Sequence, residues 1–268
     1  MAAFIPELDD VRRAQAIVAG YTKSRQAIIA ARPGNPMRAE ARTFEGGGLA
    51  LRTPGFPGSV FNRAYGFHDG LLNDLPGVIA WFAAGIGGVF ELAPGQPIAK
   101  TARMLADAGY SQSGFHATMV GPVDLAEQRA SGVEVDKVED EAALAMFSDA
   151  YHAGWAITDF RVPMGPWLGA PGWSLYLARR DGKPAGAAIL YQVGEDAYLA
   201  DGAVDPAFRG HGLHRALLDR RCSDAAATGA KRVFGGCEFL SGSYRNQLRK
   251  GLGLLYTEAL WASAPSSR

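Results

Sequence analysis

The sequence predicts a mixed α/β (α+β) fold, in which helices alternate with strands that are mostly antiparallel. Apolar residues recur at helical spacing in some segments and form short uninterrupted runs in others, and glycines stand where the helical segments end. The segment Asp181-Gly182-Lys183-Pro184 separates two apolar runs and has the composition of a hairpin turn. These observations favour a central sheet flanked by helices.

Composition and charge narrow the class of protein. The 268 residues allow one large domain or two of ordinary size, and 48% hydrophobic with 20% charged residues is typical of a soluble globular protein. The 27 Lys and Arg residues balance the 27 Asp and Glu residues, so neither nucleic acid nor an anionic membrane is expected as the main partner. The uncharged, largely apolar run at residues 75–90 is shorter than the ~20 apolar residues of a membrane-spanning helix.

Cysteine content and the N-terminal segment predict the cellular compartment. Cys222 and Cys237 cannot form a disulfide framework for a chain of this length, and they lack the spacing of a metal site. The first residues show no basic stretch followed by an apolar run, so secretion is not expected. A reducing, cytoplasmic setting fits this pattern best.

Helices and strands can be assigned along the chain from the spacing of apolar residues and from the glycines and prolines that interrupt it. Residues 1–45 are expected to be largely helical, with a break at residues 32–36. Residues 44–62 are expected to form an irregular, partly extended connection. Further helices are expected at residues 75–84, 98–108, 141–152, 213–228 and 243–250. Strands are expected at residues 62–67, 88–92, 116–120, 133–138, 173–179, 185–193, 198–204, 231–238 and 254–261.

The two halves of the chain contain the same order of predicted elements near their ends. A helix, a glycine and a strand occur in MLADAGYSQSGFHATM and again in NQLRKGLGLLYTEALW. This pattern suggests an internal duplication of about 130 residues. It predicts domains at residues 1–130 and 131–268; the alternative is one domain with a helical extension.

The segment AYLADGAVDPAFRGHGLHRA carries the clearest chemical signal. A predicted strand ends at Val204, and Arg209-Gly210-His211-Gly212 opens a predicted helix. Glycines let the backbone approach a ligand closely, and the free N–H groups of a first helical turn bind anions such as phosphate. The alternative is a tight strand–helix turn without a ligand. The segment is not a P-loop, since no Gly-Lys-Ser/Thr follows, and it does not fit the dinucleotide pattern G-x-G-x-x-G.

This segment resembles the acetyl-CoA pyrophosphate loop of the GNAT (GCN5-related N-acetyltransferase) superfamily, Arg/Gln-x-x-Gly-x-Gly/Ala. Arg209, Gly212 and His214 occupy the three signature positions. His214 departs from the usual Gly or Ala, so its side chain is expected to point away from the pyrophosphate. The resemblance implies a cofactor site for acetyl-CoA that comprises Gly202, Ala203, Val204, Arg209, Gly210, His211, Gly212, Leu213, His214 and Asn246.

The resemblance also implies an arrangement of domains and roles. It implies two GNAT-like mixed-sheet domains in tandem, each with a central, mostly antiparallel sheet flanked by helices. The backbone of residues 202–204 would pair with the pantetheine arm, and Asn246 would contact CoA or simply lie on a helix surface. Residues 1–130, which lack the loop, would form a degenerate domain that shapes the acceptor pocket and binds no CoA.

Candidate catalytic residues follow from the expected direct attack of an amine on the thioester. The family's usual acid is a tyrosine four residues before a Gly-aromatic or Gly-aliphatic pair, and that position here is Gln247. Tyr244 and Tyr256 are alternative acids or packing aromatics. Glu238 is the first candidate base and Asp201 the second; either carboxylate could instead be solvated at a strand end.

The remaining reactive side chains suggest an acceptor region and no metal site. Aromatic residues in the Pro- and Gly-rich residues 154–172 and just after them would line an acceptor pocket or belong to the core: Trp155, Phe160, Trp167 and Trp173. Cys237 has no histidine placed by sequence to activate it. No metal is expected, because the histidines show no ligand spacing: His68, His116 and His152.

The sequence therefore predicts a cytoplasmic N-acetyltransferase that moves an acetyl group from acetyl-CoA to a primary amine of a small molecule. The expected partner is the amine, with no nucleic acid or membrane, and the expected state is a monomer or homodimer. Two alternatives remain: a non-catalytic acyl-CoA-binding or regulatory protein, and an acetyltransferase that acts on protein N-termini or lysines.

Overall fold

The computed structural model describes residues 7–44, 48–56, 60–66, 72–83, 87–94, 98–123, 131–158 and 161–263. They belong to two compact units, each made of two chain segments. Unit 1 comprises Met1–Tyr21 and Thr118–Leu255, and unit 2 comprises Thr22–Ala117 and Tyr256–Arg268. Helix α1 (Leu8–Ala30) and strands β5 (Tyr110–Pro122) and β11 (Gly253–Ser263) contribute residues to both units. The related halves 1–130 and 131–268 stay a prediction.

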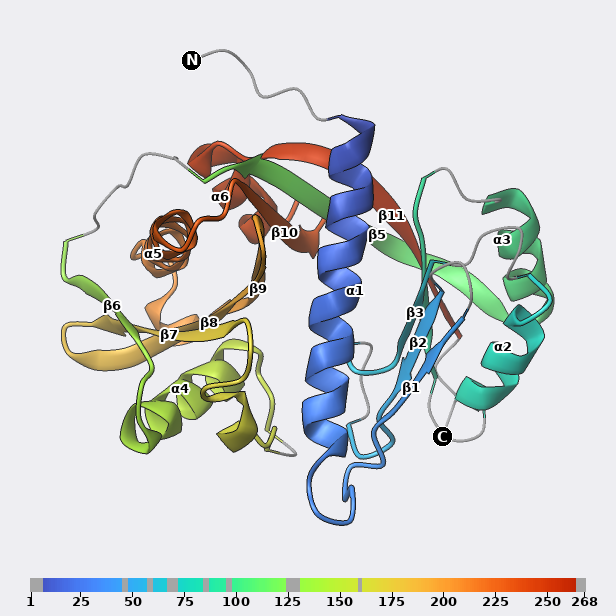
Figure 1. Cartoon of the computed structure of the whole chain (residues 1–268), viewed down its shortest axis with the longest axis horizontal. Helices are drawn as coiled ribbons and strands as arrows, with labels where there is room; N and C mark the ends of the chain where they lie inside the picture. Colours follow the sequence, from blue (N-terminus) through green and yellow to red (C-terminus); the bar gives the residue numbers. More distant parts are fainter. Residues whose placement is uncertain are drawn as a thin grey trace. The chain divides into compact units, whose positions relative to one another are not determined.

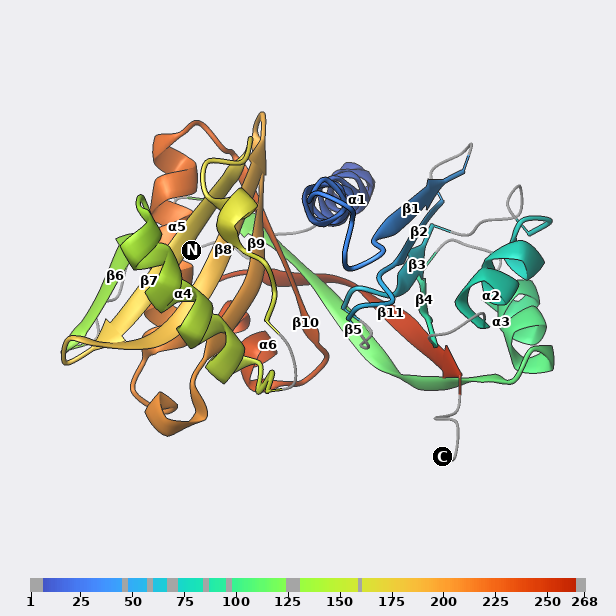
Figure 2. The same cartoon turned by 90° about the horizontal axis from the view of Figure 1, so that it is seen from below.

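Unit 1 is a mixed sheet with helices on both faces. Its strands follow the order β11-β5-β10-β9-β8-β7-β6, antiparallel from β6 to β9 and parallel between β9 and β10. The sheet lies between α4 and α5 (Figures 1 and 2). The elements not yet bounded are β6 (Val133–Lys137), α4 (Glu141–Gly154), β7 (Trp173–Arg180), β8 (Lys183–Val193), β9 (Asp196–Val204), α5 (Leu213–Ala227), β10 (Arg232–Glu238) and α6 (Gly242–Lys250), with single 3-10 turns at Gly165–Trp167 and Pro206–Phe208.

Local sequence signals explain several of these boundaries. Asp181 and Gly182 both have positive φ, 49° and 77°, so the expected hairpin turn joins β7 to β8. The Asp140 side chain accepts a hydrogen bond from Ala143 N–H and caps α4. Ser241 caps the start of α6 in the same way, and Gly251 at φ 108° ends it.

Unit 2 contains a second sheet region, with strand order β1-β2-β3-β4-β11-β5. Its core is aromatic: Phe82 meets Phe90 edge to face, and Phe90 meets Tyr110 in the same way. The elements not yet bounded are β1 (Glu40–Thr43), β2 (Leu49–Arg52), β3 (Arg63–Tyr65), α2 (Leu75–Ala83), β4 (Val89–Leu92) and α3 (Ile98–Asp107). No helix in the described ranges is long and apolar enough to cross a membrane.

The predicted mixed α/β class is confirmed, and most elements lie where the sequence placed them. The N-terminal assignment was wrong in part. Residues 1–45 are not helical throughout, because α1 ends at Ala30 and β1 occupies Glu40–Thr43. The segment expected to be irregular and partly extended contains strand β2, whose Leu49, Ala50 and Leu51 are buried. A strand as short as β2, set among glycines and prolines, shows no hydrophobic periodicity in the sequence. It forms because it pairs with β1 and β3.

Candidate functional site

The loop between β9 and α5 forms an anion-binding shape at a helix N-terminus. Gly210 and Gly212 have φ of 84° and 83°, a region in which a side chain would be strained. The first helical hydrogen bond of α5 runs from Ala216 N–H to Gly212 O at 3.0 Å. The N–H groups of residues 213–215 therefore belong to the first turn, which a helix leaves for outside acceptors.

Arg209 is held at the mouth of this loop. Its Nε donates to Val204 O at 3.2 Å, and its Nη2 donates to Gly154 O at 3.4 Å. A Cβ placed on Gly154 would lie 2.7 Å from Ala203 Cβ, so the end of α4 packs directly on the end of β9. The exposed guanidinium is thus positioned beside the loop by two carbonyl groups and adds a fixed positive charge there.

Strand β9 contains a bulge just before the loop. Its pairing with β8 passes from Ala187–Ala203 to Ile189–Ala200, so Asp201 and Gly202 together face Ala188. Asp201 adopts φ 43°, the left-handed region that Asp tolerates better than most residues. Bulges interrupt a ladder and re-aim side chains, and they are common beside active sites.

Arg221 fixes the two sides of this bulge. Its buried guanidinium donates through Nη1 to Ile189 O and to Ala200 O, both at 2.9 Å, and through Nε to Leu217 O at 3.0 Å. Burial lowers the pKa of Arg221 to about 10. The positive charge of Arg221 therefore lies beside the bulge, where backbone carbonyl groups bind it.

Strands β9 and β10 separate at the same end. Their parallel ladder runs from Asp196–Arg232 to Leu199–Gly235, whereas the strands themselves continue to Val204 and Glu238. Parallel strands end at the same edge of a sheet, so the bulge, the loop and the end of β10 meet there. Sequence periodicity could not show the bulge or this separation, because both depend on inter-strand register.

The family comparison agrees with this geometry. Residues 141–239, from the start of α4 to the end of β10, match the model of the acetyltransferase (GNAT) family. This chain contains a GNAT acetyltransferase domain. No protein of curated function matches the chain in sequence.

Solved structures show the same fold over most of the chain. A GCN5-related N-acetyltransferase from Kribbella flavida has a TM-score of 0.65 at 16% identity, covering 93% of this chain and 96% of that one. A GCN5-related N-acetyltransferase from Sphaerobacter thermophilus has a TM-score of 0.59 at 14% identity, covering 81% and 80%. A tandem GNAT protein from the clavulanic acid biosynthesis pathway has a TM-score of 0.53 at 14% identity, covering 92% and 96%. At these identities the likeness is one of fold.

His214, in the first turn of α5 of the GNAT domain, points toward α6 and β9. Its Nδ1 lies 3.3 Å from Asn246 Nδ2, and its Nε2 lies 3.3 Å from Ser243 Oγ. A Cβ on Gly202 would lie 3.6 Å from Nε2. Burial, and secondly the charge of Arg221, lower the pKa of His214 to about 4, so the imidazole is neutral at pH 7.

Asn246 and Gln247 of α6 both contact other residues of the protein. Asn246 contacts His214 and accepts a hydrogen bond from Arg249 Nη1 at 3.1 Å, so its role toward CoA stays a prediction. Gln247, at the usual tyrosine position, is 3% exposed. A Cβ on Gly235 would lie 2.1 Å from Gln247 Oε1, so the amide packs directly against the backbone of β10.

Asp201 is held by two tyrosine hydroxyls from different helices. Tyr21 of α1 donates to Asp201 Oδ2 at 2.7 Å, and Tyr151 of α4 donates to the same oxygen at 3.1 Å. This carboxylate lies at the β9 bulge, one residue before Gly202. The sequence indicates Asp201 as the second candidate base and gives no signal for either tyrosine, because their contacts join residues 180 and 50 positions apart.

The other residues considered from the sequence as acid, base or nucleophile differ in burial and contacts. Glu238 is exposed at the end of β10, and its carbonyl accepts from Ser241 N–H at 3.2 Å. Tyr244 is buried in α6 and packs edge to face on Phe239. Tyr256 is also buried. Burial raises the pKa of the Cys237 thiol to about 12, which opposes a role as nucleophile at neutral pH.

The expected acceptor aromatics divide between surface and core. Trp155 is 45% exposed at the end of α4, whereas Trp167 and Trp173 are buried. Trp173 packs on Tyr21 with ring centroids 5.0 Å apart, and Trp167 packs on Trp173 at 5.5 Å. Phe160 lies outside the described residues. The buried tryptophans therefore support the residues that hold Asp201.

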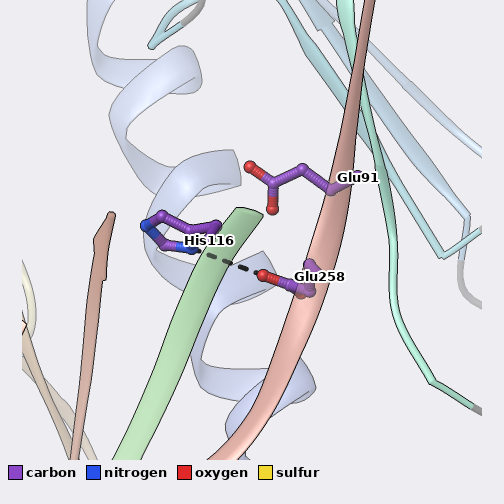
Figure 3. Close-up of side chains that lie close together, drawn as sticks. All are labelled: Glu91, His116 and Glu258. Carbon is purple, nitrogen blue, oxygen red and sulfur yellow. Dashed lines mark hydrogen bonds and ion pairs between the residues drawn. The ribbon is translucent and has the colours of Figure 1, made fainter. Parts of the chain in front are cut away.

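Unit 2 brings together a second group of reactive side chains, which sequence spacing did not indicate. Glu91 of β4, His116 of β5 and Glu258 of β11 point toward one another (Figure 3). Arg63 forms an ion pair with Glu91, and His116 Nδ1 lies 3.4 Å from Glu258 Oε2. Burial, and secondly the charge of Glu91, raise the pKa of Glu258. His68 lies outside the described residues, and His152 binds Ser148 O and Val162 N–H within unit 1.

Proposed function

We propose that this protein transfers an acetyl group from acetyl-CoA to a primary amine of a small molecule by direct attack of the amine on the thioester. One observation carries the proposal: the Arg209–Gly212 loop opens α5 directly after the bulge of β9, where β9 and β10 separate. A pyrophosphate group fits the first-turn N–H groups and Arg209. The separated strand ends offer backbone groups to an extended arm such as pantetheine.

Asp201 is the best-supported group for handling the amine. A base must lie within hydrogen-bond reach of the amine proton, directly or through one water. The bulge turns Asp201 toward α1 and α4, and the hydroxyls of Tyr21 and Tyr151 hold its Oδ2 in one orientation. In this proposal Asp201 binds the amine and accepts its proton, and Glu238, which is exposed at the neighbouring strand end, serves as the alternative base.

The departing thiolate needs less help than most leaving groups. A thiol has a pKa of about 8.5, so the thiolate can leave without a proton. The buried cation of Arg221, whose Nη2 would lie 3.3 Å from a Cβ on Gly202, favours negative charge near the bulge. Tyr244 stays the candidate acid if one is required.

The experiment that tests the proposal combines binding with turnover. Calorimetry with acetyl-CoA measures donor binding, and free-thiol release with small amines and with peptides that carry a free N-terminus or lysine measures transfer. The double variant Arg209→Glu/Gly212→Glu is expected to lose CoA binding, whereas Arg161→Glu, an exposed arginine paired with Asp149, is expected to retain it. Equal affinity in the loop variant and wild type would refute the donor site, and turnover on peptides alone would replace the small-molecule acceptor with a protein.

A second function is favoured by one observation. Gln247 stands where the family's tyrosine is usual, and its amide packs against Gly235. An acyl-CoA-binding or regulatory protein without transferase activity would need the loop but no acid. Tight CoA binding with no thiol release on any amine or peptide would establish this function in place of the transferase.

A further inference from the structure

The group formed by Glu91, His116 and Glu258 has the composition and spacing of a metal site. The three residues come from strands that are neighbours in the sheet, in the order β4-β11-β5. One ligand atom from each lies within 4.8 Å of the others. Figure 3 shows the two carboxylates and the imidazole lying close together.

Burial distinguishes this group from ordinary surface charges. Glu91 is 3% exposed and Glu258 is 9% exposed, and His116 is half-buried. Two carboxylates removed from water and placed together repel each other unless a cation lies between or beside them. Arg63 accompanies Glu91, and Glu258 has only the imidazole as its close partner among the described residues. The charge of Arg63 acts on both carboxylates, and a metal ion held between them would attract both as well.

We propose that Glu91, His116 and Glu258 bind a divalent transition-metal ion of the Zn²⁺ class. One imidazole nitrogen with two carboxylate oxygens is a ligand set that such ions accept, and three protein ligands leave a position for water. Donors about 2.0–2.2 Å from a common ion lie roughly 3–4 Å apart, so the group needs only small side-chain shifts.

Arg63 is compatible with this site as an outer partner. Carboxylates that bind metals are commonly hydrogen-bonded from behind, which orients them and tunes their charge. Arg63 contacts Glu91 Oε1, which leaves the other oxygen for a metal. Arg25 donates to Val60 O and lies over the Phe61 ring. The bound ion would link three adjacent strands of unit 2.

The test uses the full-length protein after chelator treatment, with Zn²⁺ and Co²⁺ as probes. Competition with a chromogenic chelator is expected to show one bound Zn²⁺ per chain, and Zn²⁺ is expected to raise Tm in a concentration-dependent way. Glu258→Gln and His116→Gln are each expected to weaken Zn²⁺ binding at least 100-fold. Glu134→Gln, which removes an exposed carboxylate from β6, is the matched control and is expected to bind like wild type.

Each outcome bears on the proposal. Absence of stoichiometric Zn²⁺ binding by wild type, or an equal loss in Glu134→Gln, would overturn it and leave a buried ion network. If a ligand variant fails to fold, X-ray absorption of the Zn²⁺-loaded wild type decides the question. One imidazole among oxygen donors is expected, and two imidazoles or a sulfur donor would place the ion elsewhere.

Discussion

Asp201 combines two features that its neighbours in β9 lack. Its backbone is left-handed at φ 43°, and its carboxylate accepts hydrogen bonds from Tyr21 and Tyr151. A strained, over-determined residue beside a ligand loop is a sound basis for a functional hypothesis. Asparagine tolerates the same backbone region, so Asp201→Asn removes the charge while keeping the conformation.

We expect Asp201→Asn to lower kcat by about 10²–10⁴-fold, the range lost with a general base, and to leave the Kd for acetyl-CoA unchanged. Steady-state kinetics beside calorimetry measure the two quantities separately. Glu238→Gln is the matched comparison and should change kcat only a few-fold. The reverse pattern would make Glu238 the base.

His214 is the residue whose environment differs most from that of a free side chain. Its folded pKa of about 4 lies below the ordinary 6.5, so the unfolded chain binds the proton first as pH falls. The stability that the neutral ring contributes is complete above pH 6.5 and is lost progressively between pH 6.5 and 4.

We therefore expect His214→Gln to reduce the loss of stability between pH 7 and pH 4.5 by roughly 2–3 kcal/mol. Urea denaturation at several pH values measures how the unfolding free energy changes with pH. His211→Gln, in the same loop but exposed, should keep the wild-type pH dependence. Identical curves for all three proteins would show that His214 titrates normally.

At the scale of elements, α5 supports the site through its first turn and through its middle. Its first turn forms the anion loop, and Arg221 holds the β9 bulge. Two residues before Arg221, Asp219 forms an ion pair with Lys250 of α6 at 2.6 Å, and both side chains are at most 7% exposed. This pair sets how α6, with Asn246 and Gln247, lies against α5.

Removing one partner of that pair leaves a buried charge unbalanced. We expect Lys250→Met to cost about 3–5 kcal/mol of unfolding free energy, measured by urea denaturation. Lys231→Met breaks an exposed pair with Glu195 and should cost at most about 1 kcal/mol. Equal losses of unfolding free energy in both variants would show that the buried pair contributes no more to stability than the exposed pair.

At the scale of the whole molecule, each compact unit is made of two segments that lie far apart in the sequence. Unit 1 includes residues before Tyr21, among them Arg13, which pairs with Asp196 of β9 at 2.6 Å. A cut at residue 130 would remove Arg13, Tyr21 and the part of β5 that belongs to unit 1.

We expect the fragment of residues 131–268 to lose the cooperative thermal transition of the full chain, as followed by circular dichroism. Adding residues 118–130 to the fragment restores the missing part of β5 and is the matched comparison. A cooperative transition of the shorter fragment at the full-chain Tm would instead support the boundary predicted from the sequence.

Local signals in the sequence determined the mixed α/β class, most helices and strands, and the loop. Hairpin composition at Asp181-Gly182, the cap at Gly251 and the glycines of the loop act over a few residues, so they can be read in order. Such signals also led to the GNAT resemblance, which the family match confirms. The proposed roles of Arg209 and Asn246 toward CoA rest on that resemblance.

Tertiary structure alone decided the register and the long-range contacts. The bulge at Asp201 depends on how β9 pairs with β8, and the strands at residues 40–52 form only because they pair. The tyrosines on Asp201 and the group Glu91–His116–Glu258 join residues more than 100 positions apart in most cases. Such contacts arise from the packing of elements against one another, which periodicity along the chain does not encode.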